Sequence, residues 1–477
     1  MKDFKSDIIH CLEQKDWNKA MKRLKEWEAD GSHNEPDFYF LQASLSVYLG
    51  HDHNAWLWLW RGLDLFPDNG SLNLLMGTVC LRTGREQESP AYLQKGDGEE
   101  TGSALKLDLP VDEKNEPPAG QVRVLQGTME IANQMNTLAK GLSQHGALAH
   151  TLNYYPYYLN YAADYTWSLL KERNTPVMNA RLRRLASDLL PSYDLFHFHF
   201  GTSFTLDMSD YPILKQAGKP MIMHHWGSDV RLYSTLAKTN PYAVVKTKNE
   251  ARIRYHLKRI SQYVQHCIVA DMELYEYVKD YYEHVHMIPT MIQLDRYTPD
   301  YRSNEKPLIV HAPTSPGIKG TRHILKAVES LKEKYDFHFH LVRGVSHEQA
   351  KKIYQKADLI IDQLHIGSYG LFAVESMAMG KPVICWISDF MKDHYPSELP
   401  LIRANPDNIT EVIENVLKNR DMLPEIGQKG RKYAEVHHDM VKNSKKNAGC
   451  LSVASFGMML NDFRVAGFVF QKNKTSR

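Results

Sequence analysis

The sequence predicts an α/β protein in which an α-helical region precedes two parallel sheets. Three observations predict this architecture. Residues 1–93 have a helical pattern, residues 94–119 are polar and rich in Gly and Pro, and nine short apolar runs then alternate with helical stretches. Apolar runs that alternate with helices indicate βαβ units, whose parallel strands are covered by helices on both faces.

The composition is typical of a globular protein of several domains. With 477 residues, of which 43% are hydrophobic, the chain can form roughly three cores. The net charge of +2 indicates no nucleic-acid partner. Five scattered cysteines without a C-x-x-C pair argue against disulfides and for a reducing compartment. Since neither an export signal nor a membrane-spanning run can be recognised, we expect a cytoplasmic protein.

The N-terminal region at 1–93 contains two similar halves. "DWNKAMKRLKEW" is echoed by "DHNAWLWLWRGLDLFP", and Gly50 and Gly84 are separated by about 34 residues, the period of tetratricopeptide helical hairpins. This region therefore resembles a pair of tetratricopeptide repeats, which could bind a protein partner. A plain helical cap on the next domain is the alternative.

Two further boundaries divide the rest of the chain. The polar segment 94–119 is expected to be a linker. The stretch "TPDYRSNEKP" separates five predicted strands from four, so we expect the first Rossmann-like domain at 120–303 and the second at 304–435. Residues 436–477 are expected to be a C-terminal helix and tail, and no pattern explains the sequence after 447.

A single carboxylate, Glu375, stands in the apolar stretch "GSYGLFAVESMAMGKPV". This stretch follows the predicted strand "DLIIDQL" and has the composition of a buried helix that ends at Gly380. Ligands of open parallel sheets bind beyond the carboxyl ends of the strands. A buried carboxylate without partners costs several kcal/mol, and the hydroxyls of a sugar or ribose would supply donors. A solvated Glu is the alternative, which so apolar a helix disfavours.

The stretch "YGLFAVESMAMGKPVI" resembles the nucleotide-sugar signature of the retaining glycosyltransferases of family 4, also called glycosyl transferases group 1, which have the GT-B fold. In that family two glutamates eight positions apart bracket a Gly-rich loop. The resemblance implies that Glu375 holds the ribose of the nucleotide, with Gly370, Leu371 and Phe372 beside the donor. It also implies that the C-terminal helix returns to brace the first Rossmann-like domain.

The first glutamate of this signature is absent, because Gly367 occupies its position. In the family that glutamate grips the hydroxyls of the donor sugar. Asp362, Gln363 and His365 are the candidates that could replace it.

A second match is "PLIVHAPTSPGIKGTRHILKAVESL", a strand followed by a loop and a helix that begins near Thr321. Lys319 precedes this helix, where backbone N–H groups and an ammonium can meet a diphosphate. A solvated loop lysine is the alternative. The resemblance implies that Lys319 neutralises the leaving nucleotide. The family usually has an Arg in this loop, where this chain reads "APT" at 312–314. Thr314 is assigned to the donor-binding group, and Arg343 could compensate for the missing Arg or could be a surface residue.

The first sheet is expected to bind the acceptor. By resemblance, the loop from Gly127 to Asn133 lines the cleft between the domains. In "KPMIMHHWGSDVR", relatives place a His near the reacting carbon of the donor. We favour His225 over His224 because strand alternation sends them to opposite sides. Asp229, in the turn that follows, is assigned to the catalytic group with His225.

No metal or other cofactor is expected. The pattern His-x-His occurs at His197/His199 and at His338/His340, but its recurrence indicates strand alternation, and no third ligand stands at usable spacing. The chain has no D-x-D motif. Metal-dependent glycosyl transfer therefore lacks support.

Together these features predict a hexosyl-type glycosyltransferase that moves a sugar from a nucleotide-diphosphate sugar to a glycan, lipid-linked or protein acceptor. The resemblance implies retention, with Lys319 and a helix N-terminus stabilising the leaving phosphate without metal. The alternative is a GT-B protein that has lost turnover and acts as a glycan- or nucleotide-binding or scaffold protein through its repeats.

Residues 171–259 contain 15 Lys and Arg against 7 Asp and Glu, in helices of amphipathic spacing. Such helices can dock on the anionic inner face of a membrane. A solvated basic surface is the alternative.

Overall fold

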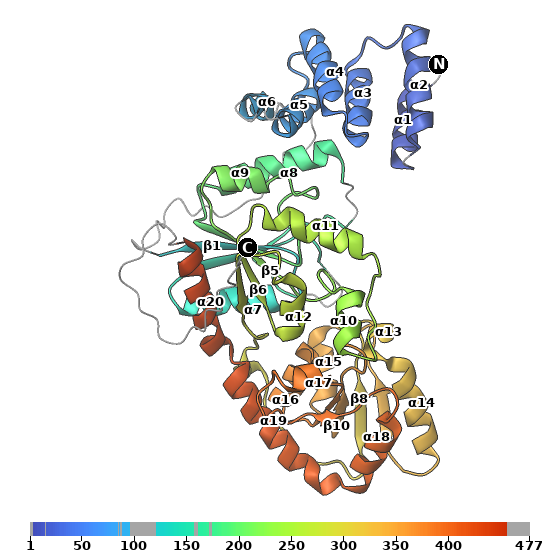
Figure 1. Cartoon of the computed structure of the whole chain (residues 1–477), viewed down its shortest axis with the longest axis vertical. Helices are drawn as coiled ribbons and strands as arrows, with labels where there is room; N and C mark the ends of the chain where they lie inside the picture. The colour runs from blue at the N-terminus through green and yellow to red at the C-terminus, as the bar shows by residue number, and fades with distance from the viewer. Residues whose placement is uncertain are drawn as a thin grey trace. The chain divides into compact units, whose positions relative to one another are not determined.

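The computed structural model describes residues 3–14, 16–83, 85, 88–95, 121–156, 161–170 and 174–455 (Figure 1). Most of the expected linker at 94–119 and the tail from 456 lie outside these residues. The chain forms two compact units. The first comprises Met1–Glu113, Lys171–Ser192 and Phe204–Ile213, and the second comprises Lys114–Leu170, Tyr193–Ser203 and Leu214–Arg477.

The first unit is helical, as the N-terminal pattern predicts. Each helix packs against its neighbour in sequence, around two apolar cores in which Trp27, Phe38 and Leu59 are buried. Helix α8 (Pro176–Leu189) also belongs to this unit and packs on α5, where its buried Arg183 donates a hydrogen bond to Thr78. The N-terminal helices are α1 (Phe4–Glu13), α2 (Trp17–Asp30), α3 (Pro36–Tyr48), α4 (Asp52–Leu65), α5 (Gly70–Arg82) and α6 (Ser89–Lys95).

The second unit contains two sheets, and every pair of neighbouring strands in the described residues is parallel. The first sheet has the order β3-β2-β1-β4-β5-β6-β7. Its strands are β1 (Arg123–Thr128), β2 (Leu148–Asn153), β3 (Tyr165–Thr166), β4 (Leu195–His199), β5 (Met221–His224), β6 (His266–Val269) and β7 (His284–Met287). The helices between and after these strands are α7 (Gln134–Gln144), α9 (Tyr211–Gln216), α10 (Tyr233–Thr239), α11 (Glu250–Ser261) and α12 (Met272–Val278), followed by the 3-10 turn η1 (Leu294–Arg296).

The second sheet has the order β12-β11-β10-β8-β9. Its strands are β8 (Leu308–His311), β9 (His338–Leu341), β10 (Leu359–Ile361), β11 (Val383–Cys385) and β12 (Ile402–Arg403). Its helices are α13 (Pro316–Lys319), α14 (Thr321–Lys332), α15 (His347–Tyr354), α16 (Leu371–Ala378), α17 (Asp389–Lys392), α18 (Ile409–Lys418), α19 (Leu423–His437) and α20 (Met440–Ser455), with the 3-10 turn η2 (Arg420–Met422). One apolar core lies on each face of this sheet.

The predicted α/β class and the nine predicted strands are confirmed, while β2, β3 and β12 were not foreseen. One expectation is wrong: the loop predicted from Gly127 to Asn133 does not begin at Gly127, because β1 continues through this residue to Thr128. In this position Gly127 pairs with Leu152 of β2, and an added Cβ would lie 3.3 Å from the Leu152 carbonyl oxygen.

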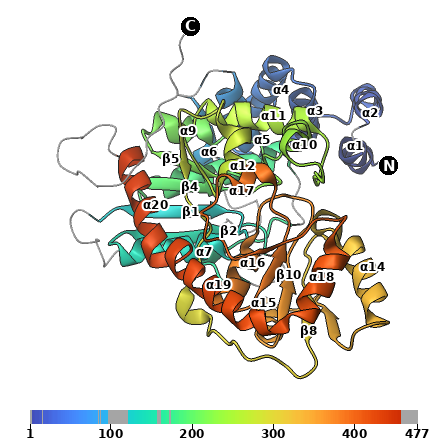
Figure 2. The same cartoon turned by 60° about the horizontal axis from the view of Figure 1, so that its bottom comes forward.

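Two C-terminal helices connect the sheet domains (Figure 2). Helix α19 packs on α16 of the second domain, and α20 packs on α7 of the first. At the second contact an added Cβ on Gly141 would lie 2.4 Å from the Ser444 side chain, so glycine permits the close approach. The expected return of the C-terminal helix to the first sheet domain is thus observed.

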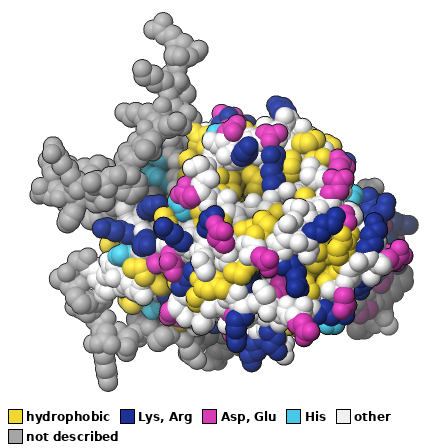
Figure 3. All heavy atoms as spheres, turned by 90° about the horizontal axis from the view of Figure 1, so that it is seen from below, with side chains coloured by type: hydrophobic (Ala, Val, Ile, Leu, Met, Phe, Trp, Pro, Cys, Tyr) yellow, Lys and Arg dark blue, Asp and Glu magenta, His cyan; other side chains and the backbone are white. Residues whose placement is uncertain are grey.

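The surface carries both signs of charge. On the face shown in Figure 3, Lys and Arg side chains are interspersed with Asp and Glu. Within the described part of the chain, no helix combines the length and apolar character needed to cross a bilayer.

Candidate functional site

Lys319, Asp362 and Gly370 form a polar cluster beyond the carboxyl ends of β8 and β10. The Lys319 ammonium lies 2.6 Å from Oδ1 of Asp362, and the Gly370 N–H donates to Oδ2 at 3.0 Å. The Asp362 side chain is fully buried, whereas that of Lys319 is 15% exposed. An added Cβ on Gly370 would lie 3.4 Å from Nζ of Lys319, which shows how closely the ammonium approaches the start of α16. The structure therefore presents a partly exposed cation at the start of α16.

The turn before α14 brings Lys319 to this position. Gly320 has φ +75°, a conformation that glycine adopts readily, and an added Cβ there would lie 2.9 Å from Cβ of Leu364. Of the residues that the structure describes, none caps the N-terminus of α14 or of α16 with its side chain. Uncapped N–H groups and the helix dipole favour an anion at the N-terminus of each of these two helices. The cluster can therefore bind a negatively charged group.

Glu375 lies in the second turn of α16 and is 5% exposed. Its Oε1 accepts hydrogen bonds from the Tyr297 hydroxyl and from Nε2 of His347, both at 2.8 Å. Among the described residues, none donates to Oε2. The carboxylate is thus held by protein donors on one oxygen and keeps acceptor capacity on the other. Neither Tyr297 nor His347 stands in a recognisable pattern, so sequence reasoning missed both.

A small pocket connects Glu375 with the first sheet domain. Its lining includes Asn133 at the start of α7, Leu371 of α16 and Glu375 itself. Three predicted residues from two separate parts of the sequence are therefore brought together. Asn133 has φ +62°, in the left-handed region that Asn tolerates, and it precedes the first residue of α7.

Gly367 lies directly against the first sheet domain. It has φ +85°, and an added Cβ would lie 3.0 Å from Nδ2 of Asn240 and 3.0 Å from Cβ of Ser388. The Asn240 side chain donates to the His365 carbonyl at 2.7 Å and accepts from Trp386 Nε1–H at 3.0 Å. A glutamate at position 367 would be strained and would displace Asn240, which gives a physical reason for its absence.

The three candidate replacements for that glutamate are engaged within the protein. Asp362 binds Lys319, the Gln363 amide donates to the Ser368 carbonyl, and Nδ1 of His365 lies 3.0 Å from the Tyr242 carbonyl oxygen. Each is therefore already used in holding the loop that Gly367 belongs to.

The other residues predicted to bind the nucleotide sugar differ in exposure. Thr314 follows β8 and Arg343 follows β9, and both side chains are exposed. The ring of Phe372 packs against Tyr354, with centroids 4.7 Å apart, inside an apolar cluster. Thr314 and Arg343 can meet a ligand with their side chains, whereas Phe372 stabilises α16.

His225 and Asp229 form a buried pair after β5. Nδ1 of His225 lies 2.7 Å from Oδ2 of Asp229, and its Nε2 lies 2.7 Å from the Tyr282 hydroxyl. Oδ1 of Asp229 also accepts the N–H groups of Trp226 and Gly227. The His225 side chain is only 1% exposed. The neighbouring His224 ring instead stacks on Trp226, so the two rings do have different surroundings.

Glu130 is a further candidate that sequence reasoning missed, although it lies in the predicted loop from Gly127 to Asn133. Its carboxylate accepts the N–H groups of Met135 and Asn136 at 3.1 and 3.0 Å and thereby caps α7. Burial raises the pKa of Glu130 to about 7. A Glu shortly before a helical run was the available signal.

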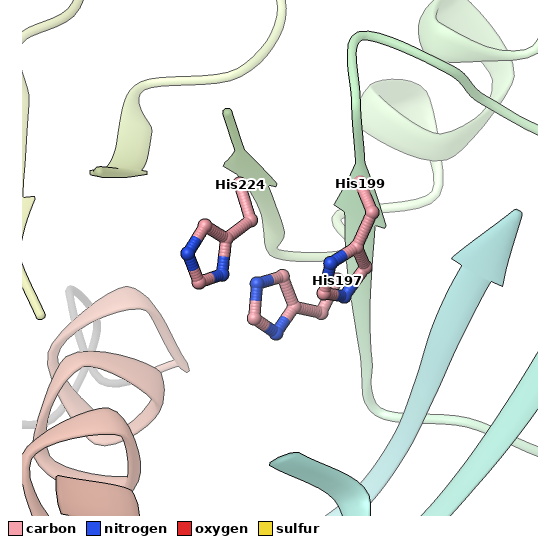
Figure 4. A group of neighbouring side chains, drawn as sticks. All are labelled: His197, His199 and His224. Carbon is pink, nitrogen blue, oxygen red and sulfur yellow. The ribbon is translucent and has the colours of Figure 1, made fainter. Parts of the chain in front are cut away.

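A third histidine stands beside the His197/His199 pair. Sequence spacing offered no such ligand, but the fold places His224 of β5 next to His197 and His199 of β4 (Figure 4). The His338/His340 pair is exposed on β9.

Comparisons with known proteins identify part of the chain. Residues 317–433, which contain Lys319 and Glu375, match the family model described as "Glycosyl transferases group 1". The chain has no match among curated proteins at the sequence level.

The fold is similar to that of several solved structures. A sucrose-phosphate synthase (tll1590) from Thermosynechococcus elongatus is 14% identical, with a TM-score of 0.50 over 71% of this chain and all of that chain. Anabaena Alr3699/HepE in complex with UDP-glucose is 12% identical, with a TM-score of 0.49 over 70% of this chain and all of that one. A UDP-GlcNAc 2-epimerase from Neisseria meningitidis is 15% identical, with a TM-score of 0.44 over 69% and 99%. The chain therefore has the GT-B fold, and the match of residues 317–433 to the glycosyl transferases group 1 model supports a glycosyltransferase.

Proposed function

We propose that this protein transfers a hexosyl group from a nucleotide-diphosphate sugar to a glycan, lipid-linked or protein acceptor, with retention and without a metal in the transfer step. The observation that carries the proposal is the position of Lys319 and Glu375 around the start of α16, inside the region that matches the group 1 model. A cation can bind the phosphates of a nucleoside diphosphate, and a carboxylate can accept the hydrogen bonds of its ribose hydroxyls.

Lys319 supplies the charge that the leaving group needs. As the bond to the sugar breaks, negative charge develops on the diphosphate, and a preorganised cation next to uncapped helix ends stabilises it. A bound diphosphate would compete with Asp362 for the ammonium, which lies 2.6 Å from that carboxylate. Thr314 and Arg343 are proposed to contact the same phosphates from the loops after β8 and β9.

Glu375 is proposed to accept the ribose hydroxyls through Oε2. Tyr297 and His347 hold Oε1 and so fix the direction of the other oxygen. Leu371 and Asn133 line the same pocket as Glu375, which supports the proposal that the acceptor binds beside the nucleotide. His225 and Asp229 are proposed to lie near the reacting carbon.

Nucleotide binding is the first test. Thermal shift and calorimetry with a panel of nucleotide sugars should give stabilisation by one nucleotide, and this stabilisation should be lost in Glu375→Ala. In the presence of candidate acceptors, the nucleotide sugar that stabilises the protein most should also release free nucleotide fastest. If no nucleotide sugar stabilises the protein, the proposal is refuted.

The second candidate function is a GT-B protein that binds a nucleotide or glycan without turnover and acts as a scaffold through its helical unit. Two observations favour it: Gly367 replaces a donor-binding glutamate, and His225 is buried with both ring nitrogens engaged. Nucleotide binding without any hydrolysis or transfer would support this candidate over the enzyme.

We also propose that α11 contacts anionic membranes at the cytoplasmic face. Arg252, Arg254 and Lys258 are exposed on this helix, and Tyr255 beside them is 60% exposed. Arg183 of α8 cannot contribute, because it is fully buried. The protein should float with anionic vesicles, and this flotation should be lost when the three basic residues of α11 are replaced by Gln. Binding only to neutral vesicles would contradict the proposal.

A further inference from the structure

Three histidines from two neighbouring strands lie together in the first sheet domain (Figure 4). His197 and His199 are two positions apart on β4 and share one face of the sheet, and His224 pairs with His199 across to β5. The centroids of the three rings are 4.5 to 5.6 Å apart. One nitrogen of each ring lies within 4.8 Å of the others, and all three residues are buried.

Two of these rings lack hydrogen-bond partners within the part of the chain that the structure describes. There, both nitrogens of His197 and both nitrogens of His224 are buried without a partner. A neutral imidazole carries one donor and one acceptor, and each buried group left unsatisfied costs about 1–3 kcal/mol. Four such atoms in one place would therefore weaken the sheet unless something binds to them.

His199 is oriented by its neighbours. Its Nε2 lies 3.1 Å from Oε1 of Gln126, which accepts only if Nε2 carries the proton. Nδ1 is then the lone-pair nitrogen, and it accepts from Trp226 Nε1–H at 3.2 Å. Metal-binding histidines commonly donate their other nitrogen to a side-chain or backbone oxygen, as His199 does to Gln126.

The type of ligand indicates which ion would fit the three buried imidazoles. Imidazole nitrogen suits Zn²⁺ and other late first-row transition metals.

We propose that His197, His199 and His224 bind one transition-metal ion, with Zn²⁺ as the first ion to test. Tetrahedral Zn²⁺ holds nitrogens about 2.0–2.1 Å from the metal and hence about 3.3 Å from one another, so the ring nitrogens must approach by at most about 1.5 Å. His199 would exchange its bond with Trp226 for the metal. The ion would link β4 to β5 and bind one of the unpartnered nitrogens of His197 and one of those of His224.

A second histidine group in the same sheet provides a matched control. His266 of β6 stacks on His284 and His286 of β7, at centroid distances of 4.6 and 5.4 Å. Here Nδ1 of His266 lies 3.1 Å from Nε2 of His286, so these two rings satisfy each other, and the His284 side chain is 44% exposed. This group also consists of stacked histidines, but a metal would stabilise it less, because two of its rings bind each other and the third is partly exposed.

The test measures metal in the full chain, purified through an affinity tag that contains no histidine. Elemental analysis should find about one zinc per chain in the natural protein and in the double variant His284→Asn/His286→Asn, and less than about a tenth in His197→Asn/His224→Asn. Titration of the metal-free natural protein with Co²⁺ should produce the visible absorption of a tetrahedral site, and zinc should raise its melting temperature. These two measurements need no variant, so they test the proposal even if the double variant His197→Asn/His224→Asn, here called the triad variant, folds poorly.

Three results would overturn the proposal. The first is a natural protein that takes up neither zinc nor cobalt after reconstitution. The second is equal metal content in the natural protein and the triad variant, which would assign the ions to surface histidines. The third is loss of the cobalt spectrum in the control variant, which would place the site on β6 and β7.

Discussion

The carboxyl-terminal edges of the two sheets carry similar polar residues but use them differently. At the second sheet, Lys319 is partly exposed, and both protein hydrogen bonds to Glu375 end on one oxygen. At the first sheet, both nitrogens of His225 are bound, and Asp229 accepts from three groups. A polar group that its own domain already satisfies has little to gain from a ligand. This difference supports the proposal that the nucleotide binds at the second sheet, while His225 and Asp229 at the first sheet are engaged by their own domain.

The largest expected effect is that of Lys319→Ala. We expect turnover to fall by about a hundredfold to a thousandfold, because a preorganised donor to the developing charge is removed. The exposed Lys326→Ala on α14 is the control and should leave turnover unchanged. Since Asp362 would lose its partner, the melting temperature is measured beside the steady-state rate. Unaltered turnover in Lys319→Ala would remove this residue from the proposed role.

Glu375→Ala should weaken nucleotide binding by about tenfold to a hundredfold, because hydrogen bonds to a charged group contribute about 1.5–3 kcal/mol. Calorimetry with the nucleotide found by the thermal-shift panel measures the change. Glu348→Ala is the matched control, since this carboxylate is 60% exposed and pairs with Arg296. Equal affinities of the two variants would show that the carboxylate at 375 only supports the fold.

Asp229→Asn examines the edge of the first sheet. Asparagine can still accept the backbone N–H groups, but its amide nitrogen cannot accept from His225. We expect the free energy of unfolding to fall by about 1–2 kcal/mol, and turnover by about tenfold, with nucleotide affinity unchanged. Denaturant unfolding and calorimetry measure these changes, with the exposed Asp280→Asn as control. A large loss of nucleotide affinity would mean that the first sheet binds the donor as well.

The smallest expected effect is the pH dependence that Glu130 contributes. Its pKa is raised to about 7 by burial, from the ordinary value of 4.5. Between these two pH values the native state holds a proton that the unfolded state has lost, so this group lowers the free energy of unfolding as pH rises through the window and then levels off. Glu130→Gln should remove this slope, and the exposed Glu283→Gln should keep it. Denaturant unfolding at several pH values provides the measurement, and identical slopes in both variants would contradict the prediction.

Much of the fold could be predicted because buried parallel strands are continuous apolar runs. "PLIVHA" and "LIIDQL" contain β8 and β10, at the centre of the second sheet. The missed strands lack such runs. β3 and β12 are two-residue edge strands, and β2 reads "LAHTLN", in which Thr151 bonds to Asp164 rather than adding to an apolar stretch.

The second-sheet part of the site was more predictable than its surroundings. Lys319, Gly370 and Glu375 could be foreseen because glycine turns and helix starts fix where a side chain lies after a strand. The partners of Glu375 could not, since Tyr297 and His347 come from other segments and meet it only by packing. Whether the predicted residues bind a nucleotide sugar stays a prediction.

By itself, the sequence determined the alternation of strands and helices, the helical N-terminal region and the apolar helix on which Glu375 stands. Only the tertiary structure decided that Asn240 lies against Gly367 and that His224 joins His197 and His199. The physical reason is the range of the interactions. Strand and helix patterns depend on neighbours a few positions away, whereas these contacts depend on which strands pair and how two domains pack.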